Sequence, residues 1–166
     1  VRASEERVFF QREGEGRVTA CLGFDNWPLP IPLVKTGASW RFDSRAGAEE
    51  VLRRRIGRNE LRTLDALQAI VDAQRQYYLG NLDGNGVLHY ASRIMSSPGK
   101  RDGLYWPARA GAPESPLGPM VADAQQEGYG KKGAPYHGYY YRLLTAQGPE
   151  ARGGAYDYLR NGRMVG

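Results

Sequence analysis

The sequence is poor in the residues that form covalent cross-links and metal sites. Its 166 residues include one cysteine, Cys21, and two histidines, His89 and His137. A single cysteine excludes a disulfide within the chain, and these three side chains cannot complete a zinc site without carboxylates. Cys21 with either histidine could supply a nucleophile and a base, but no sequence spacing links them. We therefore interpret Cys21 as a packing residue of a strand.

Long apolar runs are absent as well. No segment approaches the roughly 18 apolar residues of a membrane-spanning helix, so we expect no transmembrane segment in this chain. Residues 1–6 contain no apolar core of a signal peptide. Two interpretations stay open: a soluble cytoplasmic protein, or a chain that begins after a removed leader.

Chain-bending residues, by contrast, are abundant. The sequence holds 22 glycines and 10 prolines, with 41% hydrophobic and 25% charged residues. This composition favours a globular α+β fold with many short elements joined by turns. The net charge is +5, but consecutive arginines at residues 53–55 point about 100° apart on a helix and form no phosphate-reading stripe. We expect no nucleic-acid partner.

The N-terminal third predicts an antiparallel sheet. Residues 7–13 and 17–24 flank a glycine turn, and residues 31–35 and 40–42 form a second hairpin. The prolines of the intervening segment favour an edge or an extended connection. Alternation predicts that four residues of the first hairpin face a core: Val18, Ala20, Leu22 and Phe24.

Two helices are predicted next. Ser44 is a candidate N-cap for the first, and Gly57 is its candidate C′ residue. The second runs over residues 59–79 and stops at Gly80. Its apolar stripe must be covered by a downstream segment, and it consists of Leu61, Leu64, Leu67, Ile70, Val71, Gln74, Tyr77 and Tyr78. We place a domain boundary between regions 1–57 and 58–166.

The remaining chain predicts shorter elements. They are a short helix or strand at 90–95, an irregular connection at 96–119, a helix at 118–126, a strand at 139–144, and a hairpin of 155–159 with 163–165. Asn161 and Gly162 form the turn of that hairpin, since Asn-Gly suits the left-handed positions of a two-residue turn.

The loop after the second predicted helix has a partial calcium-loop pattern. Asn81, Asp83 and Asn85 occupy the first three ligand positions, and Gly86 occupies the position of the sharp bend. Position twelve is Ser92 in place of the glutamate, and one carboxylate gives little charge. We therefore favour a plain Asx-Gly turn, and we expect no metal and no other cofactor.

Aromatic residues crowd between residues 102 and 158. Aromatic rings stack on flat apolar faces of sugars and peptides, but strand alternation turns about half of them inward. The candidate binding residues are Tyr105, Trp106, Tyr136, His137, Tyr139 and Tyr141. Asp102 and Glu114 are candidate carboxylates of a hydrolase, although spacing in sequence does not give their separation.

Several segments together resemble a bacterial family catalogued as a domain of unknown function, DUF2950. They are residues 27–35, 40–43, 54–61, 72–75, 98–100, 102–107, 114–119 and 136–149. The resemblance implies an exported protein, periplasmic or secreted, and a chain that is part of a longer one. It also implies NTF2-like hairpins in the N-terminal sheet, and a looser likeness of the later region to type IV pilin-like heads.

These observations favour a non-enzymatic envelope protein that acts by binding or assembly, as a filament or complex subunit. A glycan-binding module and a carboxylate-based envelope hydrolase are the alternatives. We further predict that the strand edge around residues 163–165 pairs with a segment outside this chain, either a severed piece of the protein or a neighbouring subunit, because an unpaired edge is a template for another strand.

Overall fold

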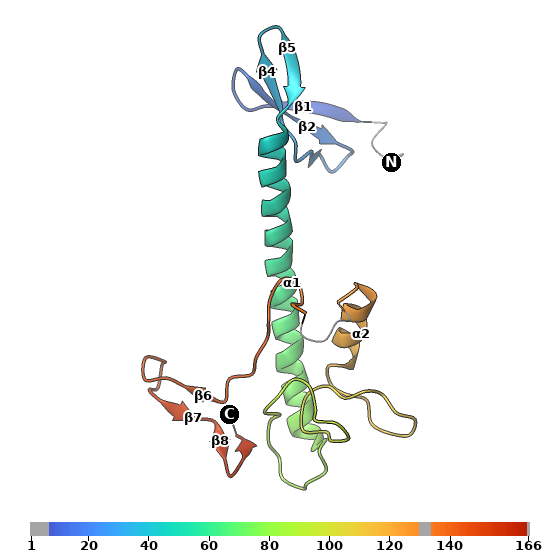
Figure 1. Ribbon diagram of the computed structural model, residues 1–166, viewed down its shortest axis with the longest axis vertical. Helices are drawn as coiled ribbons and strands as arrows, with labels where there is room; N and C mark the ends of the chain where they lie inside the picture. The colour runs from blue at the N-terminus through green and yellow to red at the C-terminus, as the bar shows by residue number, and fades with distance from the viewer. Residues whose placement is uncertain (1–6, 130–133, 166) are drawn as a thin grey trace. The chain divides into compact units, whose positions relative to one another are not determined.

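The computed structural model describes residues 7–129 and 134–165. The chain divides into two compact units, Val1–Asn59 and Glu60–Gly166. An N-terminal antiparallel sheet, a long helix and small antiparallel sheets make the fold α+β, as predicted (Figure 1). The elements are β1 (Val8–Arg12), β2 (Arg17–Leu22), β3 (Trp27–Pro28), β4 (Leu33–Thr36), β5 (Ser39–Phe42), α1 (Ser44–Gly80), α2 (Gly118–Gln126), β6 (Ala146–Gln147), β7 (Tyr156–Asp157), β8 (Leu159–Arg160) and β9 (Arg163–Met164).

The N-terminal unit is built on one five-stranded sheet. Its strand order is β1-β2-β4-β5, and the short β3 also pairs with β2. Both predicted hairpins are confirmed, and every pair is antiparallel. The central strand β2 is buried from Val18 to Cys21. The prediction for Phe24 is wrong: it is 70% exposed, because β2 ends at Leu22 and the chain turns there.

A single helix replaces the two that the sequence predicted. α1 runs without interruption from Ser44 to Gly80 and passes through Gly57. An interior glycine costs about 1 kcal/mol relative to alanine, which the helix formers on either side of Gly57 overcome. The N-cap is Asp43 rather than Ser44, since Asp43 Oδ1 accepts a hydrogen bond from the Ala46 N–H at 3.1 Å.

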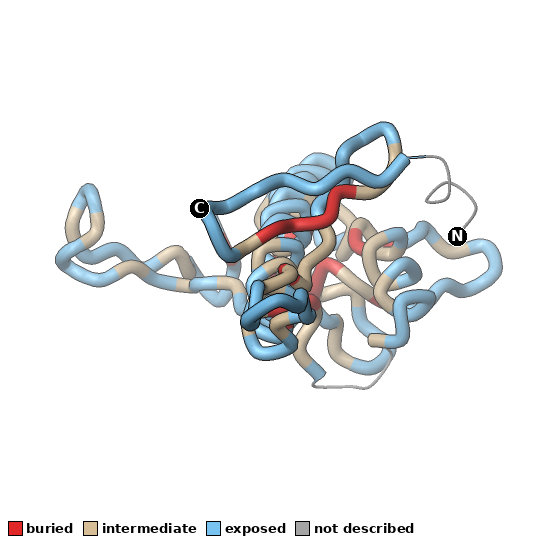
Figure 2. Tube along the Cα trace, turned by 90° about the horizontal axis from the view of Figure 1, so that it is seen from above, coloured by how far each residue is buried: buried red, intermediate tan, exposed pale blue. Residues whose placement is uncertain are grey.

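The core of the second unit lies on one face of α1. Four residues of this face, at helical spacing, are buried: Ala66, Ile70, Ala73 and Tyr77. Three of them pack with residues of the downstream loops, namely Ala91, Leu104, Trp106 and Leu117. Figure 2 shows how short the buried segments are along the chain.

The predicted cover of the helix stripe is therefore only partial. Leu61, Leu64, Leu67 and Val71 are 45–66% exposed. The downstream loops pack on the neighbouring face instead, around Ile70, Ala73 and Tyr77. Among the described residues, no helix is both long enough and apolar enough to cross a membrane.

The structure corrects two predicted elements of the second unit. Residues 140–144 are not a strand. Tyr136 and Tyr139 exchange both backbone hydrogen bonds, at 2.9 and 3.1 Å, so the chain pairs with itself before the predicted strand begins. Residues 90–95 form neither a helix nor a strand, and make only the single bridges of Tyr90 and Met95.

Two other predictions are confirmed. The helix predicted at 118–126 is α2. The Asn161-Gly162 turn joins β8 to β9, and the φ angles of 51° and 76° place both residues in the left-handed region. The first arm of the predicted hairpin is correct only at its end, because Tyr156 and Asp157 pair with β6. One partner of β9 comes from inside the chain, because the Tyr90 N–H donates to the Met164 carbonyl at 2.8 Å.

Candidate functional site

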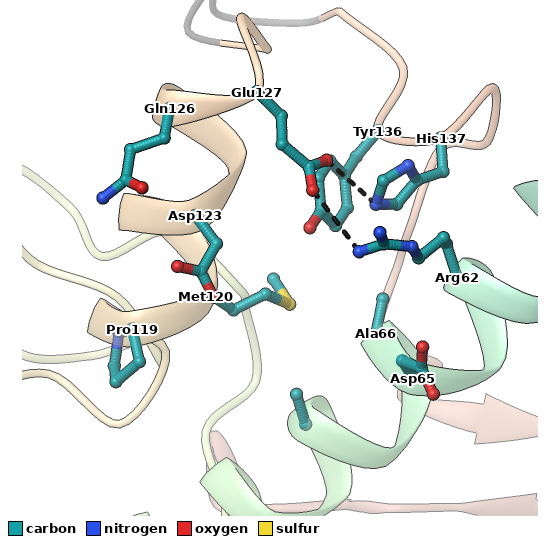
Figure 3. Close-up of a pocket in the computed structure, with 11 residues that line it drawn as sticks. Arg62, Asp65, Ala66, Pro119, Met120, Asp123, Gln126, Glu127, Tyr136 and His137 are labelled. Atoms are coloured by element: carbon teal, nitrogen blue, oxygen red, sulfur yellow. Dashed lines mark hydrogen bonds and ion pairs between the residues drawn. The ribbon is translucent and has the colours of Figure 1, made fainter. Parts of the chain in front are cut away.

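A cleft of about 480 Å³ opens within the second unit (Figure 3). Three segments form its walls: the middle of α1, the helix α2 with its C-cap residue, and the turn that follows Tyr136. The lining residues are Arg62, Asp65, Ala66, Ala69, Pro119, Met120, Asp123, Gln126, Glu127, Tyr136 and His137.

Helical spacing places the lining residues of each helix on one face. Arg62, Asp65, Ala66 and Ala69 are separated by three or four positions along α1. The lining residues of α2 and its C-cap also recur at intervals of three or four positions, and they are Pro119, Met120, Asp123, Gln126 and Glu127. The charged side chains therefore stand on the rim, while alanines and a methionine form an apolar floor.

The third wall depends on a strained two-residue turn. His137 and Gly138 have φ angles of 51° and 84°, between the paired Tyr136 and Tyr139. Histidine is one of the side chains enriched in the left-handed region. This turn holds the His137 ring 5% exposed, with its centroid 4.0 Å from that of Tyr136.

Glu127 connects the three walls. Its Oε1 lies 3.4 Å from Arg62 Nη1 on α1, and its Oε2 lies 3.5 Å from His137 Nε2 on the turn. Burial raises the pKa of Tyr136, and the carboxylates of Glu127 and Asp123 raise it further. The phenol of Tyr136 is therefore neutral at physiological pH.

The charge of the cleft is opposite to that of the whole chain. Asp65, Asp123 and Glu127 place three carboxylates around one guanidinium, that of Arg62, whereas the chain has a net charge of +5. The described part of the lining contains no serine, threonine or cysteine, so these residues offer none of the usual hydroxyl or thiol nucleophiles. The arrangement suits a cation with an apolar stem.

The structure disperses the predicted binding residues. Tyr136 and His137 line the cleft. Tyr141 lies behind it, with its hydroxyl 3.3 Å from Thr63 Oγ1. Tyr139 is 40% exposed beside the turn. The remaining two pack in or against the hydrophobic core, namely Trp106 and Tyr105.

The charged lining residues were missed by the sequence reasoning. Arg62 and Asp65 lie three positions apart on the helix predicted at 59–79. Asp123 and Glu127 lie four positions apart, in and just after the helix predicted at 118–126. Each pair has the spacing of a common solvent-exposed face. The signal that could have found them is the excess of acidic over basic residues at these positions, in a chain that is basic overall.

The predicted metal and hydrolase residues lie elsewhere. Asp83 Oδ2 is 2.8 Å from His89 Nε2, so the only carboxylate of the 81–86 loop already has a partner. The described ranges hold no group of three His, Cys, Asp or Glu side chains placed for a metal ion. Asp102 accepts two hydrogen bonds from Ser97, and neither it nor Glu114 lines the cleft.

Cys21 has a packing environment. The side chain is 2% exposed in the central strand β2, and its Sγ lies 4.0 Å from Gln11 Oε1 on β1. A buried thiol beside a neutral amide has no neighbouring base that would activate it.

Comparisons with known proteins give one match. A family model described as a protein of unknown function, DUF2950, matches residues 1–166. No curated protein and no solved structure matches the chain.

Proposed function

Since the family model matches all of its residues, the chain belongs to the DUF2950 family, and we propose that it is part of an exported, non-enzymatic protein that acts by binding at the cell envelope. The ligand of the cleft is a basic group on an apolar stem, such as an arginine or lysine side chain of a polypeptide. The export part of this proposal rests on the resemblance described from the sequence.

One observation carries the proposal: an acidic rim surrounds an apolar floor and an aromatic wall. Asp65 and Asp123 are not paired with Arg62, which contacts Glu127. Two carboxylates therefore face the cleft for an incoming ammonium or guanidinium group. The ring of Tyr136 supplies a face for a cation–π contact, and Ala66 and Met120 supply surface for the stem.

The test uses two short peptides, acetylated tri-arginine amide and acetylated tri-glutamate amide, titrated by calorimetry. We expect binding of tri-arginine alone, weakened by salt because the rim charges are exposed. Asp65→Asn with Asp123→Asn weakens binding at least tenfold. Arg62→Gln strengthens it, because it removes the cation that competes for Glu127.

The direction of the Arg62→Gln effect separates the possible ligands. An anionic ligand requires Arg62, so that variant would abolish its binding. Tighter binding of tri-glutamate than of tri-arginine, or equal binding of tri-arginine to the wild type and the double aspartate variant, contradicts the proposal. Asp72→Asn on the outer face of α1 is the matched control, since it removes one carboxylate outside the cleft.

The other functional predictions stay predictions. Assembly through the β9 edge requires an outside strand to displace Tyr90 from the Met164 carbonyl. The glycan-binding and hydrolase alternatives, and the NTF2-like and pilin-like resemblances, have no further support, since no solved structure matches. Tyr105 and Trp106 pack against or within the core, which removes them from a common ring platform with Tyr136.

A further inference from the structure

The sheet of the N-terminal unit has one apolar face and one polar face. Residues directly opposite in an antiparallel sheet point to the same side, and the register pairs Phe10 with Ala20, Val18 with Leu33, and Leu33 with Phe42. The apolar face defined in this way consists of Val8, Phe10, Val18, Ala20, Leu22, Trp27, Leu33, Trp40 and Phe42, with Arg12 and Lys35 as its charged residues among those described.

The first turns of α1 meet the sheet at a few residues. A small cleft of about 220 Å³ is lined by Glu13, Arg17 and Thr19 of the polar face and by Glu50 and Arg54 of the helix. Arg54 Nη1 also donates to the Pro28 carbonyl at 2.7 Å. Arg54 Cζ also lies 5.4 Å from the centroid of the Trp27 ring, so α1 reaches the sheet at the short strand β3.

The outer strands of the apolar face are left open, whereas Val18 and Ala20 of its central strand are buried. Its large side chains are substantially exposed, with Val8 at 50%, Phe10 at 60%, Trp40 at 47% and Phe42 at 53%. Contiguous apolar surface of this kind marks an interaction site in a folded protein. Single exposed apolar residues need no explanation, but four large ones on one side of one sheet do.

We infer that the apolar face is the docking surface for an acidic amphipathic helix of a partner protein. Among the described residues, the charges on the face are basic: Arg12 stands opposite Val18, and Lys35 stands opposite Trp40. A second copy of the chain would bring like charges toward one another, which disfavours self-pairing. A partner with acidic flanks and an apolar centre satisfies both properties of the face.

The dimensions agree with a helix. Four strands about 4.8 Å apart give a face about 15–20 Å wide, and a helix with its side chains is about 10–12 Å in diameter. An anionic membrane fits less well, because Glu15 lies in the β1–β2 turn at the end of the sheet. A carboxylate at that position repels an anionic surface.

The test uses two synthetic 18-residue amphipathic peptides without tryptophan. One combines leucine with glutamate, and the other is identical except that lysine replaces glutamate. Binding is followed by the tryptophan fluorescence of the protein, with Trp40→Phe to assign the signal. We expect the glutamate peptide to bind at least tenfold more tightly than the lysine peptide.

Two variants make the prediction specific to this face. Arg12→Glu with Lys35→Glu inverts the preference between the peptides, and Phe10→Ser weakens binding of the glutamate peptide at least tenfold. Circular dichroism checks that both variants remain folded. Arg53→Glu on α1 is the charge control and leaves the preference unchanged.

Three results overturn the inference. The first is no binding of the glutamate peptide, or equal binding of both peptides. The second is binding to phosphatidylglycerol vesicles in place of the peptide, lost in Phe10→Ser, which makes a membrane the occupant. The third is a dimer in sedimentation experiments that Phe10→Ser converts to a monomer, which makes a second copy the occupant.

Discussion

The indole Nε1 of Trp106 donates a hydrogen bond to the backbone carbonyl of Pro113 at 3.0 Å. The bond closes the segment between these two residues over the ring, which is 6% exposed. The Arg101 guanidinium lies 5.8 Å from the ring centroid. Trp106 therefore anchors an irregular connection that has no strand or helix of its own before α2.

Replacing Trp106 tests this anchor. We expect Trp106→Ala to lower the free energy of unfolding by about 3–5 kcal/mol, the range for emptying a buried aromatic site. Trp106→Phe keeps most of the packing and loses the bond to Pro113, so its effect is smaller. Urea denaturation measures both. Tyr140→Ala is the control, because that side chain is 77% exposed and its loss changes stability by less than about 0.5 kcal/mol.

Tyr77 makes the second unit sensitive to high pH. Burial, with the nearby charges of Asp83 and Asp102, raises the pKa of Tyr77 to about 12, above its value of about 10 in an unfolded chain. The stability that this difference contributes is complete below pH 10 and is lost as pH rises toward 12. It amounts to about 2–3 kcal/mol.

Tyr77→Phe removes that titration. We expect it to cost about 1 kcal/mol at pH 7, because the hydroxyl donates to the Arg101 carbonyl at 2.8 Å. Between pH 10 and 12 the variant then loses less stability than the wild type. Denaturant melts over this range measure the difference, and parallel curves for the two proteins would show that Tyr77 does not titrate as described.

Alanine substitutions at two glycines are expected to change the stability in opposite directions. A Cβ at Gly57 in α1 meets nothing within 4 Å, whereas a Cβ at Gly103 lies 2.7 Å from the backbone nitrogen of Ser96. We expect Gly57→Ala to raise stability by about 0.5–1 kcal/mol. Gly103→Ala lowers it, since two backbones must separate. If the two substitutions changed the melting temperature equally, the close approach of the backbones at residues 96 and 103 would be contradicted.

Calcium provides a further test of the 81–86 loop. We expect no rise in melting temperature with millimolar calcium over chelator, because Asp83 is the only carboxylate of the loop and already contacts His89 at 2.8 Å. Thermal scans under both conditions measure this. A calcium-dependent increase that disappears in Asp83→Asn would establish a site.

Local patterns were sufficient where neighbours in sequence decide the structure. The Asn161-Gly162 turn and the helix α2 follow from residues within a few positions of one another. Local signals also misled at Gly57, where a plausible helix end lies inside α1. The energy of continuing the helix exceeded the cost of one glycine, and a glycine alone does not reveal that balance.

The cleft could not be predicted from local sequence patterns. Arg62 and Glu127 are separated by 65 positions, and their contact depends on how α2 and the turn at His137 pack against α1. Tyr136 and His137 were named from aromatic content, but the acidic residues beside them carry no local signal. The contact is a product of packing, which depends on distant side chains.

By itself, the sequence determined the α+β class, the two N-terminal hairpins and the helix α2, because backbone propensity and alternation act over short distances. Only the tertiary structure decided which surfaces meet. Arg54 of α1 donates to the Pro28 carbonyl of β3, and Phe10 is left exposed. Alternation assigns residues to two faces but does not say which face a helix covers, since that depends on the summed packing of the whole unit.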